Sequence, residues 1–290
     1  MIFLQLVINS FVLGSVYALV ALGFALIYNT TRIFHIAYSA LFIIPPFLSI
    51  LLFTQFKFPL LLSCLVSIFL TCIISVGIEY WIYQPFYKGS NGTNAALISS
   101  IGVMIIITGL VSLIFGSETY HFNYNISPTF TFGPLIITYI QWWQFLICNI
   151  TVILFLSSMK LFRLGVKIRA LRDSHVLFKA VGMNTNKTRL WVFCLSGLFI
   201  SISANLVAYD IGIDPYIGMS FLLNAIVALI VGGIGSFVGP VIGGFIISFL
   251  QSFTVYLFSD KIQEPITFLI LIFFLLYRPQ GLLGEKKRIV

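Results

Sequence analysis

Long apolar stretches separated by short polar segments run from the first residues of the chain almost to its end. A membrane-spanning helix needs about 20 predominantly apolar residues. This pattern predicts helices at residues 3–28, 36–53, 60–83, 95–115, 139–159, 190–209, 221–235, 239–258 and 264–278. The stretch 221–235 is too short to cross as a straight helix, so we expect it to be broken or re-entrant. If it does not cross, a division of 36–53 at Pro45-Pro46 is one way to restore the parity of the spans.

The composition indicates an integral membrane protein. Of the 290 residues, 60% are hydrophobic and 8% are charged, whereas soluble domains carry roughly 25% charged residues. A chain with so few charges cannot cover a surface that faces water. The expected fold class is therefore all-α, a polytopic transmembrane helical bundle of about eight to ten spans.

The basic residues are concentrated in one segment, residues 160–189. Half of the 16 Lys and Arg residues lie there: Lys160, Arg163, Lys167, Arg169, Arg172, Lys179, Lys187 and Arg189. Because Lys and Arg resist translocation, we expect this segment to stay in the cytoplasm. We attribute the net charge of +8 to this bias and expect no nucleic-acid partner.

Alternating the spans outward from this segment sorts the remaining charges by side. The inner side collects the eight residues above together with Arg32, Lys88, Arg278, Lys286, Lys287 and Arg288, and only Lys57 and Lys261 fall outside. The acidic residues that fall outside are Glu118, Asp210, Asp214, Asp260 and Glu264. This split predicts an extracytoplasmic N-terminus and a cytoplasmic C-terminus.

The basic segment also carries the signals of a short helix. Asp173 or Ser174 can cap its start, and Gly182 stands where a helix often ends in the left-handed conformation. Its apolar residues would share one face: Val176, Leu177, Ala180 and Val181. Asn186 is a candidate cap for the next span. We therefore expect a short surface helix with an apolar side that needs a partner.

A Gly-rich stretch, Gly232-Gly233-Ile234-Gly235-Ser236, joins two of the apolar runs. It is not a phosphate-binding loop, because it lacks the Gly-Lys-Ser/Thr sequence and does not follow a strand. Close backbone approach between helices is one interpretation, and a hinge or broken helix that lines a path is compatible with it. Gly232, Gly233 and Gly235 are our candidates for these roles.

Residues that could support catalysis are sparse. His35, His121 and His175 lie in different regions, and Glu79 is the one acidic candidate within a span. The four cysteines show no metal-ligand spacing: Cys64, Cys72, Cys148 and Cys194. We predict no catalytic residue and no metal site. A stand-alone secondary transporter and a membrane-embedded enzyme stay open as alternatives; the first would work without ATP, and the second needs a paired nucleophile and base.

A series of short segments follows one order through nearly the whole chain. These are Gly14-Ser15-Val16-Tyr17-Ala18-Leu19, Ala21-Leu22-Gly23, Ile27-Tyr28, Glu79 with Tyr83 and Pro85, Leu97-Ile98-Ser99-Ser100-Ile101-Gly102, Ala180-Val181-Gly182-Met183-Asn184, Pro215-Tyr216-Ile217-Gly218, the Gly-rich stretch, Gly243-Gly244 and Arg278-Pro279-Gln280-Gly281-Leu282-Leu283-Gly284. The series resembles the permease subunits of branched-chain amino acid ABC importers, of the LivH type. No single segment is decisive, but the ordered set is highly specific.

The resemblance implies one permease domain over residues 1–290, with a type II-like ABC importer architecture, in a bacterial plasma membrane. It implies three kinds of partner: a second permease subunit in a homo- or heterodimer, two cytoplasmic ATP-binding subunits that use ATP and Mg, and an extracytoplasmic substrate-binding protein. This chain would itself bind no cofactor and catalyse no reaction. Segment 160–189 would be the coupling loop, with these candidate residues: Arg169, Arg172, Phe178, Lys179, Ala180, Gly182 and Met183.

The chain departs from the family pattern near the expected translocation pathway. After Arg32 the family usually reads Asn-Phe-Ala-His-Gly-Glu, whereas this chain has His35-Ile36-Ala37-Tyr38-Ser39-Ala40. Asn224 stands where the family often has Lys. The candidate pathway residues are Ser15, His35, Ser39 and Asn224. The solute therefore stays open between branched-chain or related small amino acids and another small amphipathic solute, such as urea or a short amide.

Overall fold

The computed structural model describes residues 2–88, 92–122, 129–132 and 135–284. Its helices are α1 (Ile2–Thr31), α2 (Tyr38–Thr54), α3 (Leu60–Gly77), α4 (Gly92–Phe115), α5 (Tyr139–Leu161), α6 (Arg163–Asp173), α7 (His175–Ala180), α8 (Thr185–Ile211), α9 (Ile217–Gly232), α10 (Gly239–Leu257) and α11 (Gln263–Tyr277). A π-helical turn, Ile78–Tyr83, and a 3₁₀ turn, Gln84–Lys88, extend α3, and a second 3₁₀ turn, Asp260–Ile262, precedes α11. Lys286, Lys287 and Arg288, which entered the charge count, lie outside the described residues.

A helix covers most of every stretch that the hydrophobic pattern predicted, so the expected polytopic helical fold is confirmed. Within the described residues, six helices are long and apolar enough to cross a membrane: α1, α3 with its extension, α4, α5, α8 and α10. Three shorter apolar helices, α2, α9 and α11, have 17, 16 and 15 residues. At 1.5 Å per residue they fall short of the roughly 30 Å of a bilayer core.

Two expected interruptions do not occur where the sequence suggested them. Helix α2 runs unbroken through Pro45 and Pro46, so the anticipated division at these prolines is wrong. Both prolines are buried, and packing around a buried helix can compensate for the lost backbone hydrogen bonds. Helix α9 is also continuous, and the Gly-rich turn follows it rather than breaking it.

The contacts divide the chain into two compact units, and both take segments from distant parts of the sequence. Unit 1 comprises Met1–Ala25, Asn123–Ile153 and Ser220–Val290, and unit 2 comprises Leu26–Phe122 and Leu154–Met219. Helices α1, α5 and α9 contribute residues to both units. The single domain expected over residues 1–290 stays a prediction, and each unit is described by itself.

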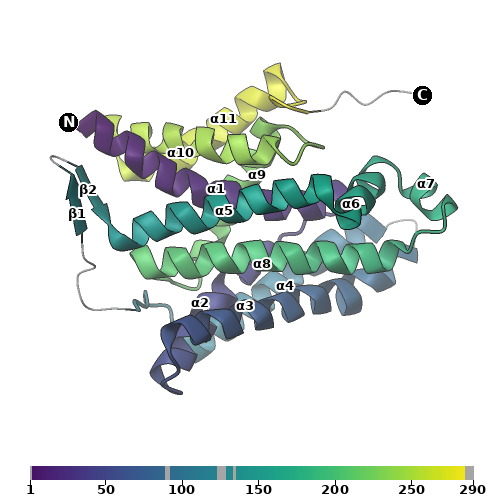
Figure 1. Ribbon diagram of the computed structural model, residues 1–290, viewed down its shortest axis with the longest axis horizontal. Helices are drawn as coiled ribbons and strands as arrows, with labels where there is room; N and C mark the ends of the chain where they lie inside the picture. The colour runs from purple at the N-terminus through teal and green to yellow at the C-terminus, as the bar shows by residue number, and fades with distance from the viewer. Residues whose placement is uncertain (1, 89–91, 123–128, 133–134, 285–290) are drawn as a thin grey trace. The chain divides into compact units, whose positions relative to one another are not determined.

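In unit 2, α3 packs against α2 and α8, and α2 also contacts α8 and α4 (Figure 1). A stripe of small polar residues, one per turn of α3, is buried: Ser63, Ser67, Thr71 and Ser75. Ser75 donates a hydrogen bond to the Phe193 carbonyl (2.8 Å), and a Cβ at Gly197 would lie 2.9 Å from the Ser75 Cβ. Small residues let helices approach closely, so this stripe explains how α3 and α8 pack.

The two ends of unit 2 differ in charge. Gly92 at the start of α4 and Thr185 at the start of α8 line one cavity, which Lys179 also lines. At the other end of these two helices, Tyr120 and Ile213 exchange two backbone hydrogen bonds of 2.8 and 2.9 Å. The basic segment therefore lies at the opposite end of unit 2 from Glu118 and Asp214, which is what the charge pattern requires.

In unit 1, α10 packs against α11 and against the first half of α1 (Figure 1). A Cβ at Gly244 would lie 2.6 Å from the backbone nitrogen of Ala18, and Ser248 donates to the carbonyl of Ser10 (2.8 Å). Strands β1 (Thr129–Phe132) and β2 (Leu135–Thr138) form an antiparallel pair in which Thr129 faces Thr138. The hydrophobic pattern of the chain did not predict this hairpin.

Candidate functional site

The basic segment folds into two short helices, of which only α7 was expected. Helix α6 begins two residues after α5 ends, and its Ile168 and Leu171 are 1% and 0% exposed. A Cβ at Gly165 would lie 2.2 Å from the carbonyl oxygen of Met159. The signal for α6 was the spacing of Ile168 and Leu171, which five charged neighbours in the same helix obscured.

Helix α7 has defined caps at both ends. The Ser174 side chain accepts a hydrogen bond from the Leu177 amide (3.3 Å), so of the two candidate caps Ser174 is the one used. At the C-terminus, Gly182 has φ +76° and its N–H donates to Lys179 (2.9 Å), while the Met183 N–H donates to Phe178 (3.3 Å). These two bonds form a Schellman motif, which favours glycine at its left-handed position.

The predicted cap of α8 is wrong by two residues. Asn184, not Asn186, precedes α8 and accepts a hydrogen bond from the Lys187 amide (3.1 Å). Asn186 instead lies in the first turn of the helix and lines the neighbouring cavity. An Asn at either position has the right chemistry for a cap, and the Schellman turn before it decides which one is used.

The apolar residues of α7 divide into one anchor and an exposed face. Phe178 is 3% exposed, so its ring holds α7 against the rest of unit 2. Val176, Leu177 and Val181 are 78%, 66% and 72% exposed. We call these three residues the α7 face. Its exposure was implied by the helical spacing, but the residues named for coupling included Phe178 instead of these three.

The other candidate coupling residues surround this face or lie behind it. Arg172 forms an ion pair with Asp173 (2.8 Å), which offsets part of its charge. Arg169 and Met183 are half-buried, whereas Lys179, Ala180 and Gly182 are exposed. Of the basic candidates, Lys179 is the one that lines the adjacent cavity.

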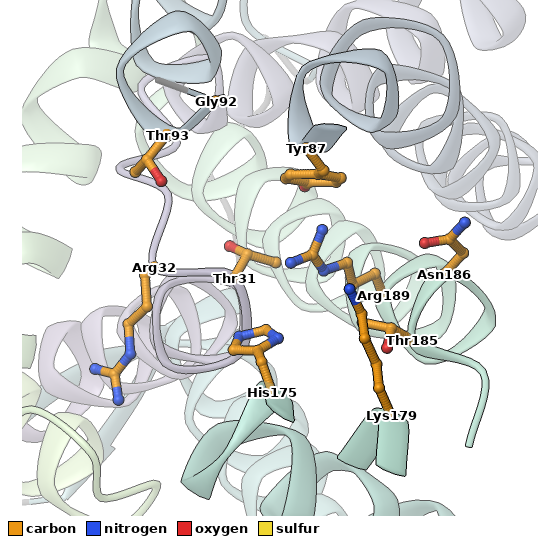
Figure 2. Close-up of a pocket in the computed structure, with 10 residues that line it drawn as sticks. All are labelled: Thr31, Arg32, Tyr87, Gly92, Thr93, His175, Lys179, Thr185, Asn186 and Arg189. Carbon is orange, nitrogen blue, oxygen red and sulfur yellow. The ribbon is translucent and has the colours of Figure 1, made fainter. Parts of the chain in front are cut away.

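That cavity, which we call the inner cavity, has a volume of about 360 Å³ and lies within unit 2. Its lining residues come from five elements of unit 2: Thr31, Arg32, Tyr87, Gly92, Thr93, His175, Lys179, Thr185, Asn186 and Arg189. Figure 2 shows Arg189 reaching into the middle of this group, below the ring of Tyr87, with the side chain of Lys179 extended toward it. Among the described residues that line it there is no Asp or Glu.

The inner cavity is electropositive. The guanidinium carbon of Arg189 lies 3.7 Å from the centre of the Tyr87 ring, a cation–π geometry, and the Tyr87 hydroxyl donates to Glu79 (2.7 Å). Burial lowers the pKa of His175, and the positive charges of Arg189, Arg32 and Lys179 lower it further, against a hydrogen bond with the Thr30 backbone. Burial and the neighbouring cations therefore both disfavour the protonated form of His175.

Two candidate pathway residues, His35 and Ser39, lie in unit 2. His35 is fully buried and its Nδ1 is 2.6 Å from the Tyr83 hydroxyl, while its Nε2 has no hydrogen-bond partner. Ser39 donates to the Ile36 carbonyl (2.9 Å) and lines a second cavity of about 450 Å³, the apolar cavity. The other residues of the apolar cavity are Met104, Ile105, Thr108, Gly109, Pro215, Tyr216, Gly218 and Met219.

The other two, Ser15 and Asn224, lie in unit 1. Ser15 donates to the carbonyl of Val12 in its own helix (2.6 Å). Asn224 accepts a hydrogen bond from the Gln251 amide (2.8 Å), which also donates to Thr267 (2.7 Å), and Gln263 donates to Gln251 (2.9 Å). We call Asn224, Gln251, Gln263 and Thr267 the unit 1 polar cluster.

The Gly-rich stretch is a place of close backbone approach in unit 1. A Cβ at Gly232 would lie 2.0 Å from the carbonyl oxygen of Gly239. Gly233 has φ +116° and Gly235 has φ +97°, conformations that side chains with a Cβ rarely adopt. The amides of Leu282 and Leu283 donate to the carbonyls of Val231 and Gly232 (both 2.9 Å), so the C-terminal segment is fixed against this turn.

The part of the chain that the structure describes contains no cluster of metal-ligating side chains. Within residues 2–88, 92–122, 129–132 and 135–284, no three or more His, Cys, Asp or Glu side chains form a group that could hold a metal ion. The cavities of unit 2 are lined instead by cations or by apolar side chains.

Comparison with known proteins identifies the family. The profile of the family described as "Branched-chain amino acid transport system / permease component" matches residues 6–277. The chain belongs to this family. It is therefore a permease component of a transport system and a multi-pass membrane protein, and the resemblance inferred from the ordered motifs is confirmed.

Individual relatives match this permease over nearly its whole length. The branched-chain amino acid permease protein BraD of Pseudomonas aeruginosa is 28% identical, over 98% of this chain and 97% of its own. LivH of Escherichia coli K12 is 26% identical over 98% and 96%, and the probable LivH of Methanocaldococcus jannaschii is 25% identical over 95% and 91%. The ribose import permease RbsC of Escherichia coli matches only 31% of this chain. No solved structure matches the permease significantly.

Proposed function

We propose that this permease forms the translocation pathway of an ATP-driven importer for branched-chain or closely related small amino acids. The observation that carries the proposal is the match to branched-chain amino acid permeases along almost the whole of both chains. The proposed assembly contains a second permease subunit, two cytoplasmic ATP-binding subunits and an extracytoplasmic binding protein. We place the basic segment and the C-terminus in the cytoplasm of a bacterium and the N-terminus outside.

The α7 face supports the proposal that force arrives from a separate ATPase. Three large apolar side chains that stay 66% to 78% exposed on a capped helix favour a protein partner. In this proposal Val176, Leu177 and Val181 contact the ATPase, and Phe178 transmits the movement of α7 to the rest of unit 2. Arg169, Arg172 and Lys179 supply complementary charge that guides association.

The apolar cavity supports passage of a small, partly hydrophobic solute. Ser39 and Thr108 provide hydroxyl groups, while Met104, Ile105 and Met219 provide apolar contact. Ligand sites are typically apolar with a few placed polar groups, and a branched aliphatic side chain fits such a lining. Gly232, Gly233 and Gly235 are the proposed hinge positions during alternating access.

Reconstitution tests the proposed function directly. The permease would be purified with its ATP-binding subunits and second permease, placed in proteoliposomes, and supplied with the binding protein and labelled leucine. We expect uptake that requires ATP and that valine and isoleucine compete away. Uptake without ATP would indicate a secondary transporter, and competition by urea or short amides but not by leucine would refute the proposed substrate class.

A pair of substitutions tests the coupling surface. We expect Leu177→Asp to weaken association with the ATP-binding subunits by ~10-fold or more, because it places a carboxylate in an apolar contact. Val238→Asp is the matched control, since Val238 is also an exposed apolar residue and lies at the start of α10, outside the α7 face. Co-purification of the subunits provides the measurement, and equal loss in both variants would contradict the assignment.

A further inference from the structure

The inner cavity contains polar groups that the rest of the protein leaves unused. Thr185 is 7% exposed and its hydroxyl has no hydrogen-bond partner, and Arg189 is 9% exposed with an unpartnered Nε. Both residues line the inner cavity. Buried polar groups are nearly always paired, so two unpaired ones in a single cavity indicate that a partner is missing.

The charges around these groups define the chemistry of that partner. Arg32, Lys179 and Arg189 bring three formal positive charges to the lining. Glu79, which is bound to Tyr87, is not among the lining residues. The lining cations can only donate and the Thr185 hydroxyl can donate as well as accept, so an anion that offers several acceptor oxygens fits the unpaired groups.

Two helix N-termini add to the positive potential. Helix α4, with 24 residues, begins at Gly92, and α8, with 27 residues, begins at Thr185, and both starts line the inner cavity. The first-turn amides of a helix and its dipole together favour phosphate groups. The Asn184 cap accepts from Lys187 and so leaves the Thr185 and Asn186 amides without this side chain as acceptor.

Arg32 differs from the other two lining cations in its backbone conformation and in the direction of its side chain. Arg32 follows the last residue of α1 and has φ +60°, in the left-handed region where glycine is the usual residue. In Figure 2 its side chain extends away from Arg189, on the far side of His175. Arg32 therefore adds positive charge at the edge of the cavity, and Lys179 and Arg189 are the two cations placed to contact a bound anion.

We propose that the inner cavity binds a phosphate group, supplied either by the headgroup of an anionic phospholipid or by free phosphate. Lys179 and Arg189 contact the phosphate oxygens, Thr185 donates its hydroxyl, and the two helix N-termini complete the site. The site lies at the ends of α1, α4 and α8, three helices that can cross a membrane, which is the level where basic pockets meet lipid headgroups. The proposal is independent of the transported solute.

Binding to the purified full-length permease in detergent tests the proposal, with two pairs of probes. One pair compares short-chain phosphatidylglycerol with phosphatidylcholine, and the other compares inorganic phosphate with chloride at equal ionic strength. We expect an anionic phosphate probe to bind the wild type and Lys179→Gln to weaken that binding roughly tenfold, as for loss of a charged hydrogen bond. Lys187→Gln is the matched control, because Lys187 is exposed in the first turn of α8 but does not line the cavity.

Thr185→Val provides a second, opposite signature. Without phosphate, this variant should be at least as thermally stable as the wild type, because it removes a buried hydroxyl that has no partner. With the phosphate probe present, the wild type should gain more stability than the variant. A merely structural threonine would instead make the variant less stable under both conditions, which would overturn its assignment to the site.

The probes also distinguish the source of the phosphate. Preference for phosphatidylglycerol with little response to inorganic phosphate supports the lipid, and the reverse supports a free phosphate; both support the site when Lys179→Gln reduces binding and Lys187→Gln does not. Equal loss in these two variants would show only a general surface charge and would overturn the proposal. So would the absence of binding by either phosphate probe, whether or not Lys179→Gln then weakens association with an ATP-binding subunit.

Discussion

In unit 1, the segments around Gly232 and Gln251 are tightly packed and their polar side chains bond to one another. The inner cavity of unit 2, by contrast, contains buried polar atoms that have no hydrogen-bond partner. In the unit 1 polar cluster the side chains of Asn224, Gln251, Gln263 and Thr267 satisfy one another, while in the cavity Thr185 and Arg189 keep unpaired atoms. An unpaired buried polar group costs about 1–3 kcal/mol. The comparison teaches that buried polar groups in an apolar protein can satisfy one another, as in unit 1, or leave donors available to a ligand where several of them line one cavity.

The largest expected effect is at Gly232, where unit 1 is most tightly closed. Gly232→Val should prevent correct folding, because even a Cβ would lie 2.0 Å from a backbone oxygen of Gly239 that cannot move without displacing α10. Gly102→Val is the matched control, since nothing lies within 4 Å of a Cβ there. Yield of monodisperse protein from membranes measures the difference. Normal yield of the Gly232 variant would show that the turn is less tightly packed than described.

The second-largest expected effect is a loss of stability on substitution in the unit 1 polar cluster. Gln251→Ala removes hydrogen bonds with Asn224, Thr267 and Gln263 and leaves a cavity, and we expect a loss of about 2–4 kcal/mol in the free energy of unfolding. Gln55→Ala, at an exposed residue after α2, should change it by less than about 0.5 kcal/mol. Denaturation in detergent provides both values. Equal values for the two variants would contradict the view that the cluster stabilises unit 1.

At the end of α7, substitutions should alter the coupling of ATP turnover to transport more than they alter stability. Gly182→Val forces a β-branched residue into φ +76° at the end of α7, at a local cost of about 1 kcal/mol or more, although nothing lies within 4 Å of its Cβ. We expect ATP turnover in the assembled complex to continue while transport falls severalfold. Gly182→Asn should recover much of the transport, because Asn tolerates the left-handed region. Unchanged transport in the valine variant would remove Gly182 from the coupling assignment.

The smallest expected effect is on the pH dependence of stability, through His175. Burial and the neighbouring cations lower the pKa of His175 below its usual value of about 6.5, so on acidification the unfolded chain takes up this proton first. The free energy of unfolding should therefore fall as the pH drops below about 6.5. His175→Gln should abolish this contribution and reduce the acid-induced loss in Tm by one or two degrees. Identical pH profiles would show that the histidine does not feel the cavity charges.

Much of the fold was accessible from the sequence because a membrane span is a local property. The stretches 95–115 and 139–159 became Gly92–Phe115 and Tyr139–Leu161, with ends displaced by a few residues. The caps of α7 were also local, since Ser174 and Gly182 act within a few positions of the helix they bound. Helix α6 was missed because its charged residues masked two buried positions, Ile168 and Leu171.

The functional surfaces were less accessible because they depend on which side of each helix is covered. Phe178 and Leu177 are adjacent, apolar and on the same helix, but one is 3% and the other 66% exposed. Hydrophobicity alone could not say which of them anchors α7 and which is available to a partner. The inner cavity was missed for the same reason: Arg32 and Arg189 are far apart in the chain, and their shared lining depends on tertiary packing.

The sequence by itself determined that this protein is a polytopic helical permease, where its long apolar helices lie and which family it belongs to, because hydrophobic length, charge bias and motif order are properties of the linear chain. Only the tertiary structure decided which polar groups are satisfied, which apolar residues of α7 remain exposed, and which cations meet in one cavity. Those properties depend on contacts between distant segments, and an atom has a partner or lacks one only after the helices have packed.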